Sequence, residues 1–312
     1  MGTTYRVQNM KSKASLRSKK VYNAFMNAIN PLLTSLVLFS LCGCISVPSP
    51  QTQQGAGHRH NASGSREAAL SQINQATDAE QVDQAIEALE KVLEQDTTDL
   101  EILARLSNLY IFKGAAYETS VRKKKAAYVK ALHFNEIAMM TSPEFRREIE
   151  AGKKTWDAVA VLDETYLPAM SFWVTALFYQ FDECLNKTLK PFNLRWVRRA
   201  EQVLARAYAL GPDWGGGQLH FTYGIYYLMP AIAGGDMEKS EAYFEKAVAC
   251  GPDWLLNRWG RARYYYGKTG DRAAAMADLQ WVLAQDAAQA PGPVFWNLYC
   301  QSDARELLEK LQ

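Results

Sequence analysis

A tetrapeptide that recurs at a fixed interval constrains the fold of this chain most. Residues 200–214 have the sequence AEQVLARAYALGPDW, and residues 240–254 have the sequence SEAYFEKAVACGPDW. The two copies are offset by 40 residues, and Gly-Pro-Asp-Trp is unchanged between them. A repeat of this length predicts a stack of similar structural units, each of which buries its apolar face against its neighbours.

The residues around the tetrapeptide predict helices. From residue 67 onward the apolar residues recur at helical spacing, and no sustained strand alternation is present. Gly-Pro ends a helix, so we expect Gly211 and Gly251 to adopt left-handed caps. We expect Asp213 and Asp253 to accept hydrogen bonds from the first amides of the following helices. The chain is therefore predicted to be all-α.

The spacing of small and bulky residues resembles that of tetratricopeptide repeats. Two segments carry the second-helix pattern with its proline: Ala200, Leu204, Ala207 and Pro212, and then Ser240, Phe244, Ala247 and Pro252. Two more carry it without the proline: Ala85, Leu89 and Val92, and Ala275, Leu279 and Val282. Small residues let paired helices approach closely, and bulky ones fill the groove of the next pair. The fold class that follows is a degenerate tetratricopeptide-like solenoid over 67–312.

The same patterns predict where the helices lie. Second helices are expected at 79–95, 199–210, 239–250 and 272–285. First helices are expected at 98–113, 217–230 and 254–267. An inserted helical segment is expected across 119–196, and a capping helix at 304–311.

The amino-terminal residues predict export. Residues 1–43 contain six basic residues and no acidic one, and an uncharged run occupies 31–41, which is typical of a signal peptide. Leu41-Cys42-Gly43-Cys44 resembles the bacterial lipoprotein box, which implies cleavage before Cys44 and lipidation of its sulfur. Residues 45–65 are rich in Pro, Gly, Ser and Gln, so 44–66 is predicted to be the lipidated cysteine and a flexible tether.

Removal of that signal changes the charge and the cysteine count. The whole chain carries 35 basic and 33 acidic residues. Loss of six basic residues leaves 29 against 33, a net charge near −4, which argues against nucleic acid as a partner. Cys184, Cys250 and Cys300 remain in the body; we interpret them as free and buried, and a Cys184–Cys250 disulfide stays open.

No catalytic motif, cofactor motif or metal-ligand motif stands out, so no catalytic residue, cofactor or metal is expected. A helical hydrolase stays open as the weakest alternative, with Asp182 and Glu183, or Asp163 and Glu164, as its carboxylates. Adjacent residues on a helix point about 100° apart, so neither pair converges on one substrate. His220 lies near Tyr223, where it is either a structural residue or a ligand contact.

Aromatic and arginine residues on the predicted first helices mark the candidate binding site. Aromatics occur on more than one face of these helices, so they are not all core, and Arg with Tyr suits a carboxylate or an acidic peptide. The alternative is solvated arginines beside core tyrosines. The candidate ligand- or partner-binding residues are Tyr223, Tyr226, Tyr227, Arg258, Trp259, Arg261, Tyr264 and Tyr265.

The lipoprotein box, the polar tether and the Trp- and Tyr-rich repeat body together resemble one family, the T component of tripartite ATP-independent periplasmic (TRAP) transporters, called TatT. The resemblance implies a periplasm-facing lipoprotein that docks a periplasmic TRAP solute-binding protein. It also implies a homotrimer and passage of a small hydrophobic or carboxylate ligand. Ile45 after Cys44 implies the outer membrane. A generic tetratricopeptide scaffold for outer-membrane or cell-wall assembly stays open as the alternative.

Overall fold

The computed structural model describes residues 45–50 and 62–312. The predicted signal peptide (1–43), the predicted lipidation site Cys44 and residues 51–61 of the predicted tether lie outside this part of the chain. Every regular element in the described residues is helical, which confirms the all-α prediction. Within the same ranges, no helix has both the length and the apolar character that crossing a membrane requires.

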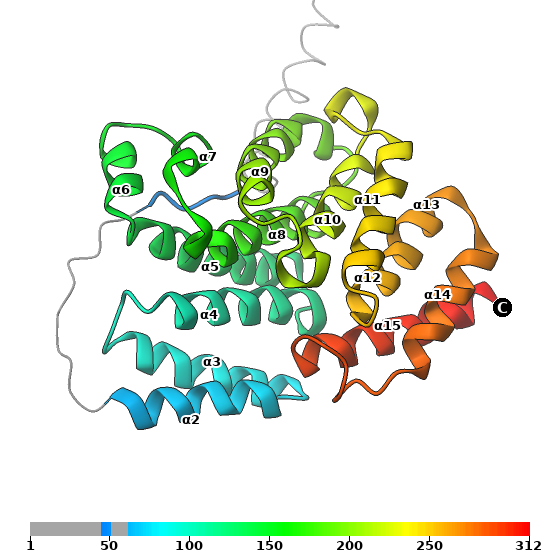
Figure 1. The fold of residues 1–312 in the computed structure, drawn as a ribbon, viewed down its shortest axis with the longest axis horizontal. Helices are drawn as coiled ribbons and strands as arrows, with labels where there is room; N and C mark the ends of the chain where they lie inside the picture. The colour runs from blue at the N-terminus through cyan, green and yellow to red at the C-terminus, as the bar shows by residue number, and fades with distance from the viewer. Residues whose placement is uncertain (1–44, 51–61) are drawn as a thin grey trace, which may run out of the picture. The chain divides into compact units, whose positions relative to one another are not determined.

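Helices that follow one another in the chain pack in pairs (Figure 1). Four pairs are α2 (Ala62–Gln75) with α3 (Ala79–Leu93), α4 (Leu100–Phe112) with α5 (Val121–Met140), α8 (Leu167–Cys184) with α9 (Lys190–Leu210), and α10 (Trp214–Tyr227) with α11 (Met237–Cys250). A fifth pairs α14 (Arg272–Ala284) with a run formed by α12 (Leu255–Gly260), the π-helical η5 (Arg261–Tyr266) and α13 (Gly267–Thr269). The last helix is α15 (Val294–Leu311).

The remaining elements are short. They are the π-helical η1 (Lys113–Tyr117), α6 (Pro143–Glu150), α7 (Thr155–Ala158), and the 3-10 helices η2 (Val159–Val161), η3 (Glu164–Tyr166) and η4 (Ala231–Ala233). The predicted first and second helices correspond to α3, α4, α9, α10, α11, the α12–α13 run and α14. The predicted insertion at 119–196 is helical, but α5 and α8 within it are repeat helices that pair with α4 and α9. Within the range 119–196, only the short elements of 143–166 depart from the paired arrangement.

The helix pairs approach closely where the sequence supplies small residues. Ala200, Ala207, Ser240 and Ala247 are all fully buried. The Ser240 hydroxyl donates a hydrogen bond to the carbonyl oxygen of Gly224 (2.9 Å), which ties α11 to α10. A Cβ atom at Gly224 would contact the Phe244 ring at 2.8 Å, so the small-and-bulky pattern works as predicted.

The 40-residue period continues into α15. The Asn257 amide donates to the carbonyls of Ala247 (2.8 Å) and Gly251 (3.0 Å). Forty residues on, the Asn297 amide donates to the carbonyls of Ala287 (3.1 Å) and Pro291 (3.3 Å). These equivalent bonds identify α15 as the first helix of another repeat. It begins at Val294, ten residues before the predicted capping helix.

Helix α15 also contacts the first half of the body. Phe112 of α4 packs against Phe295 and Trp296, with ring centroids 4.6 Å and 4.9 Å apart. The Trp296 indole donates a hydrogen bond to the Asn108 side-chain oxygen of α4 (2.7 Å). The last helix therefore lies against α4 (Figure 1), and the two helices share a wall of the site described below.

The Gly-Pro-Asp-Trp turns differ from the prediction in two ways. Gly211 and Gly251 have φ angles of −163° and −127°, so neither is left-handed. Close contact explains Gly251, because a Cβ there would overlap the carbonyl oxygen of Gly216. Neither aspartate caps the next helix: the Asp213 side chain makes no capping bond, and Trp254 is the residue that precedes α12. The left-handed residues are Gly215, Gly216 and Gly217, with φ of 64°, 64° and 88°.

The predicted tether is structured at both of its described ends. Ile45 is buried, and its backbone N–H donates to the Asn193 side chain at 3.5 Å. The Ser46 backbone exchanges two hydrogen bonds with the Gln180 side chain (2.6 and 3.1 Å). Helix α2 then begins at Ala62, inside the predicted tether. Ile45 finds an apolar site and Ser46 a side-chain amide, so this part of the segment gains contacts that offset its ordering entropy.

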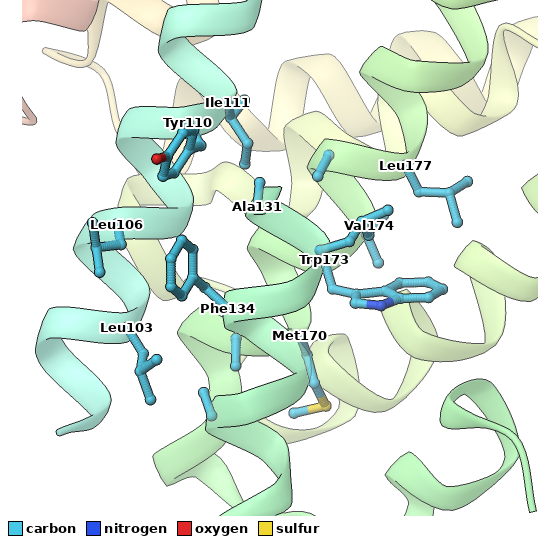
Figure 2. Close-up of a cluster of buried hydrophobic side chains, with 14 of the residues drawn as sticks. Leu103, Leu106, Tyr110, Ile111, Ala131, Phe134, Met170, Trp173, Val174 and Leu177 are labelled. Carbon is cyan, nitrogen blue, oxygen red and sulfur yellow. The ribbon is translucent and has the colours of Figure 1, made fainter. Parts of the chain in front are cut away.

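The core between α4, α5 and α8 is mainly apolar (Figure 2), and it contains one buried acid, Glu136. Leu103, Leu106, Ala131, Met170 and Trp173 are fully buried there. Glu136 of α5 is also buried and accepts hydrogen bonds from Trp173 (3.2 Å) and Thr155 (3.1 Å) through Oε1. Burial raises the pKa of Glu136 to about 8, because a buried carboxylate loses its hydration.

Candidate functional site

Three adjoining cavities lie between α4, α8, α10 and α15. The first has a volume of about 320 Å³, the second about 370 Å³ and the third about 240 Å³. The first and second share Arg105, Asn108, Phe172 and Trp214 as wall residues. The first and third share Thr175, Tyr179, Phe221 and Thr222. We call the three together the aromatic cleft; its size suits a small-molecule ligand.

Each helix contributes one face to the aromatic cleft. Helix α8 contributes Phe172, Thr175, Tyr179 and Asp182, which recur three or four residues apart. Helix α10 contributes Gln218, Phe221, Thr222 and Ile225 at the same kind of spacing. Residues so spaced lie on one face of a helix. The cleft is therefore lined by a continuous stripe of α8 facing a continuous stripe of α10.

Aromatic pairs form most of the cleft wall. Phe172 packs edge-on against Trp214 (5.9 Å between centroids), and Tyr179 stacks on Trp296 (6.5 Å). Phe221 packs against Tyr264 at 6.4 Å. Burial raises the pKa of Tyr179, and it raises that of Tyr264 to about 12, so both stay neutral. Such walls favour apolar and aromatic ligand groups.

Charged groups are few and lie toward the two ends of the cleft. Arg105 is the one charged residue among the described residues that line the first cavity. It lies 3.6 Å from Glu101, and its side chain is about half exposed. At the other end, Asp182 lines the third cavity and pairs with Lys190 at 2.5 Å. Asn108 contributes an amide beside Arg105, so one end of an apolar cleft offers a cation and an amide.

Tyr264 is the one predicted site residue that the structure places in the cleft wall. Tyr223 and Tyr227 stack instead on Tyr243 of α11, with centroids 5.0 Å and 5.5 Å away. Tyr226 is buried, and its hydroxyl donates to the carbonyl of Ala233 (3.4 Å). Tyr223 and Tyr227 thus join α10 to α11, and Tyr226 joins α10 to η4. None of the three is a residue of the cleft wall.

The predicted arginines form ion pairs within the protein. Arg261 binds the buried carboxylate of Asp278 through two nitrogens, at 2.7 and 2.8 Å. Arg258 lies 3.3 Å from the same carboxylate and stacks on Trp281 (4.7 Å). The hydrogen bonds that Arg261 donates to Asp278 raise the pKa of Arg261. Both guanidinium groups thus fasten the α12–α13 run to α14.

Trp259 and Tyr265 are also part of the core. Trp259 is buried, and its indole donates to Asp303 of α15 (2.8 Å). Tyr265 is buried against Phe244. The tyrosine and arginine runs looked equally suited to binding and to packing in the sequence. The signal that marks the cleft is the spaced stripe on α8 and α10, which lies partly inside the predicted insertion.

The acidic pairs considered for a hydrolase do not converge. Asp182 binds Lys190, whereas Glu183 binds Lys124 (2.7 Å) and Tyr128 (2.5 Å). Asp163 accepts a hydrogen bond from the Thr165 backbone (3.0 Å) at the start of η3. Of the three body cysteines, Cys184 and Cys300 are buried, Cys250 is partly exposed, and all are free. This corrects the prediction of burial for Cys250 and removes the Cys184–Cys250 disulfide.

Comparison with known proteins agrees with this picture. The model of the TRAP transporter T-component family matches residues 80–312. The chain is similar to a thermophilic TPR protein of Thermus thermophilus, with 17% sequence identity and a TM-score of 0.53, over 80% of this chain and 98% of that one. At that identity the likeness shows the fold alone, which is tetratricopeptide-like. No curated protein matches the chain.

The family match associates the chain with TRAP transport systems. The family model spans most of the chain, including α4, α8, α10 and α15 of the aromatic cleft; Ile73 and Asn74 of α2, which also line the first cavity, precede the matched residues. This protein therefore belongs to the TRAP transporter T-component family.

Proposed function

We propose that this protein is a periplasm-facing lipoprotein that docks a TRAP solute-binding protein and holds a small hydrophobic or carboxylate ligand in the aromatic cleft. The observation that carries the proposal is the aromatic cleft, with Arg105 and Asn108 at one end. A ligand with an apolar body and one carboxylate matches this arrangement: aromatic rings contact the body, and the guanidinium binds the carboxylate.

Charge at the cleft ends limits where a carboxylate would lie. Asp182 would repel an anion at the end formed by the third cavity, although Lys190 compensates it. Arg105 is shared by the first and second cavities. Glu101 also lines the second cavity and lies 3.6 Å from Arg105, but its carboxylate is paired more closely with Arg66, at 2.7 Å. The carboxylate therefore belongs at the Arg105 end. Because the Arg105 side chain is half exposed, we assign its ion pair only about 0.2–1 kcal/mol.

The buried start of the described chain supports a lipid anchor at Cys44. Ile45, the residue after Cys44 in the sequence, is buried and bonded to Asn193. The neighbouring Phe192 is 74% exposed, which offers an apolar side chain to the membrane interface. We propose that the anchor lies in the outer membrane and that the protein is a homotrimer.

Co-purification from periplasmic extract tests the docking function. Tagged full-length protein should retain a protein that mass spectrometry identifies as a TRAP solute-binding protein. Cys44→Ala should move the tagged protein from the membrane to the soluble fraction while it keeps that partner. Retention of cell-wall or outer-membrane assembly proteins in its place would favour the scaffold alternative, which the tetratricopeptide-like fold also supports.

Two probes test the ligand class. Dodecanoate and dodecanol share an apolar tail and differ in charge. Arg105→Met should weaken dodecanoate binding severalfold and leave dodecanol binding unchanged. Equal effects on both probes would contradict the assignment of the carboxylate to Arg105.

A further inference from the structure

Three side chains of metal-ligand type converge on the opposite side of α10 from the aromatic cleft. Asp213 lies in the first Gly-Pro-Asp-Trp turn, His220 on α10, and Cys250 is the last residue of α11. One ligand atom of each lies within 4.8 Å of the others. None of the three lines a cleft cavity. We call them the Asp–His–Cys cluster.

The histidine ring of this cluster is held in one orientation. His220 is buried, and its Nδ1 lies 3.2 Å from the Tyr208 hydroxyl. Its Nε2 lies 2.9 Å from Asp213 Oδ1, and the Asp213 side chain is 76% exposed. The arrangement has the form of many histidine metal ligands, in which the second ring nitrogen is hydrogen-bonded and fixes the ring.

The backbone around the cluster is also fixed. Gly217 has a φ of 88°, and a Cβ there would lie 2.9 Å from the Ala247 carbonyl oxygen and 3.2 Å from Cys250 Cβ. The Asn257 amide donates to the Gly216 carbonyl (2.9 Å) as well as to those of Ala247 and Gly251. These contacts hold the start of α10 against the end of α11. The positions of His220 and Cys250 are therefore set by the framework, whereas the exposed Asp213 can adjust.

Repeat packing does not require the cluster. Forty residues after Asp213, the next turn keeps its aspartate as Asp253. The residue forty after His220 is Gly260, and the residue forty after Cys250 is Ala290. Both repeats fold with the same turn sequence, so the turn itself does not require His or Cys at these positions.

We propose that Asp213, His220 and Cys250 bind one Zn²⁺ ion through a carboxylate oxygen, Nε2 and Sγ, with a fourth position open to water or a partner's side chain. Oxygen, nitrogen and sulfur donors together suit Zn²⁺, which takes them at about 2.0–2.3 Å in tetrahedral geometry. Those bond lengths place donors about 3.3–3.8 Å apart. Rotation of the Asp213 and Cys250 side chains brings them to that separation, and the thiol proton passes to solvent.

Titration of the purified full chain with Zn²⁺ tests the site, and Co²⁺ serves as a spectroscopic probe. We expect one Zn²⁺ per chain and a thiolate-to-cobalt charge-transfer band. Cys250→Ser and Asp213→Asn should weaken Zn²⁺ binding at least about tenfold, and Cys250→Ser should abolish the cobalt band. His220→Gln should weaken binding similarly.

Each variant has a matched control elsewhere in the chain. Asp253→Asn sits in the same turn of the next repeat, and Cys184→Ser and His133→Gln remove the same side-chain types from other helices. All three should bind Zn²⁺ like the wild type. Absence of stoichiometric binding, or equal losses in Asp213→Asn and Asp253→Asn, would overturn the proposal. Asp213 and Cys250 lie at the surface or near it, so these variants decide the question even if His220→Gln does not fold.

Discussion

Glu136→Gln is expected to stabilise the protein in a pH-dependent way. The pKa of Glu136 is raised to about 8 by burial, against an ordinary value of 4.5. The folded state therefore binds a proton that the unfolded state has lost, and stability falls as pH rises from about 4.5 to about 8. Below pH 4.5 the carboxyl is neutral in both states and contributes no penalty.

The magnitude follows from the two pKa values. At pH 7 the unfolded carboxyl lies about 2.5 units above its pKa, which corresponds to a penalty of about 3 kcal/mol in the wild type. A glutamine side chain at this position would keep the acceptor for Trp173 and Thr155 and carry no charge. We therefore expect Glu136→Gln to gain about 3 kcal/mol at pH 7, which raises Tm by about 6 °C or more. The gain should approach zero near pH 4.5.

Urea unfolding of the wild type and of Glu136→Gln between pH 4.5 and 8.5 measures this difference. Glu150→Gln, on the exposed end of α6, is the matched control and should leave the pH profile unchanged. A difference between wild type and Glu136→Gln that does not vary with pH would refute the reasoning. So would a loss of stability at pH 7.

Three further substitutions test the packing of the repeats by the free energy of unfolding. Asp278→Ala leaves Arg258 and Arg261 without their buried partner and should cost about 3–5 kcal/mol; a cost below about 1 kcal/mol would contradict the assigned role. Asn297→Ala removes the amide donor of three carbonyls and should cost about 1–3 kcal/mol, whereas a neutral effect would argue against α15 as a repeat helix. Gly260→Ala should destabilise by at least about 1 kcal/mol, because its Cβ overlaps the Phe221 ring. Gly267→Ala, where a Cβ meets only the Ala262 carbonyl oxygen at 3.7 Å and φ is −59°, is the control and should have a small effect.

The helical repeat was predictable because its packing depends on residue size at fixed spacing. Ala200, Ala207, Ser240 and Ala247 are buried where the pattern places them. Helices α5 and α8 were assigned to an insertion, although they pair with α4 and α9 as repeat helices. The period was nevertheless present in Asn257 and Asn297, whose amides make equivalent bonds forty residues apart.

Turn geometry and binding residues were harder to predict for a physical reason. Gly251 and Asp213 have residue types that suit caps, but tertiary contacts decide their roles: Gly251 lies against Gly216, and Asp213 binds His220. Tyrosine and arginine side chains stack on rings and form ion pairs within a protein as readily as they bind a ligand. Whether the Arg261 side chain can bind a ligand depends on its ion pair with Asp278, seventeen residues away on another helix. Sequence spacing does not reveal such a partner.

The sequence allowed the family to be predicted, but it did not allow the aromatic cleft to be predicted. The TatT resemblance rested on features spread along the whole chain, and the family match confirms it over 80–312. The aromatic cleft depends on α15 returning to contact α4, a meeting of residues almost two hundred positions apart. Only Tyr264 of the predicted residues reaches it.

The most direct test of the central claim fills the aromatic cleft and measures ligand binding. Thr175 lies in the wall between the first and third cavities, so Thr175→Trp should occupy the space that a ligand needs. Thr188→Trp, at an exposed turn, is the matched control. Dodecanoate binding by isothermal titration calorimetry should fall at least about tenfold in Thr175→Trp and stay at the wild-type level in Thr188→Trp. Undiminished binding by Thr175→Trp, with its helix content intact, would contradict the claim that the aromatic cleft holds the ligand.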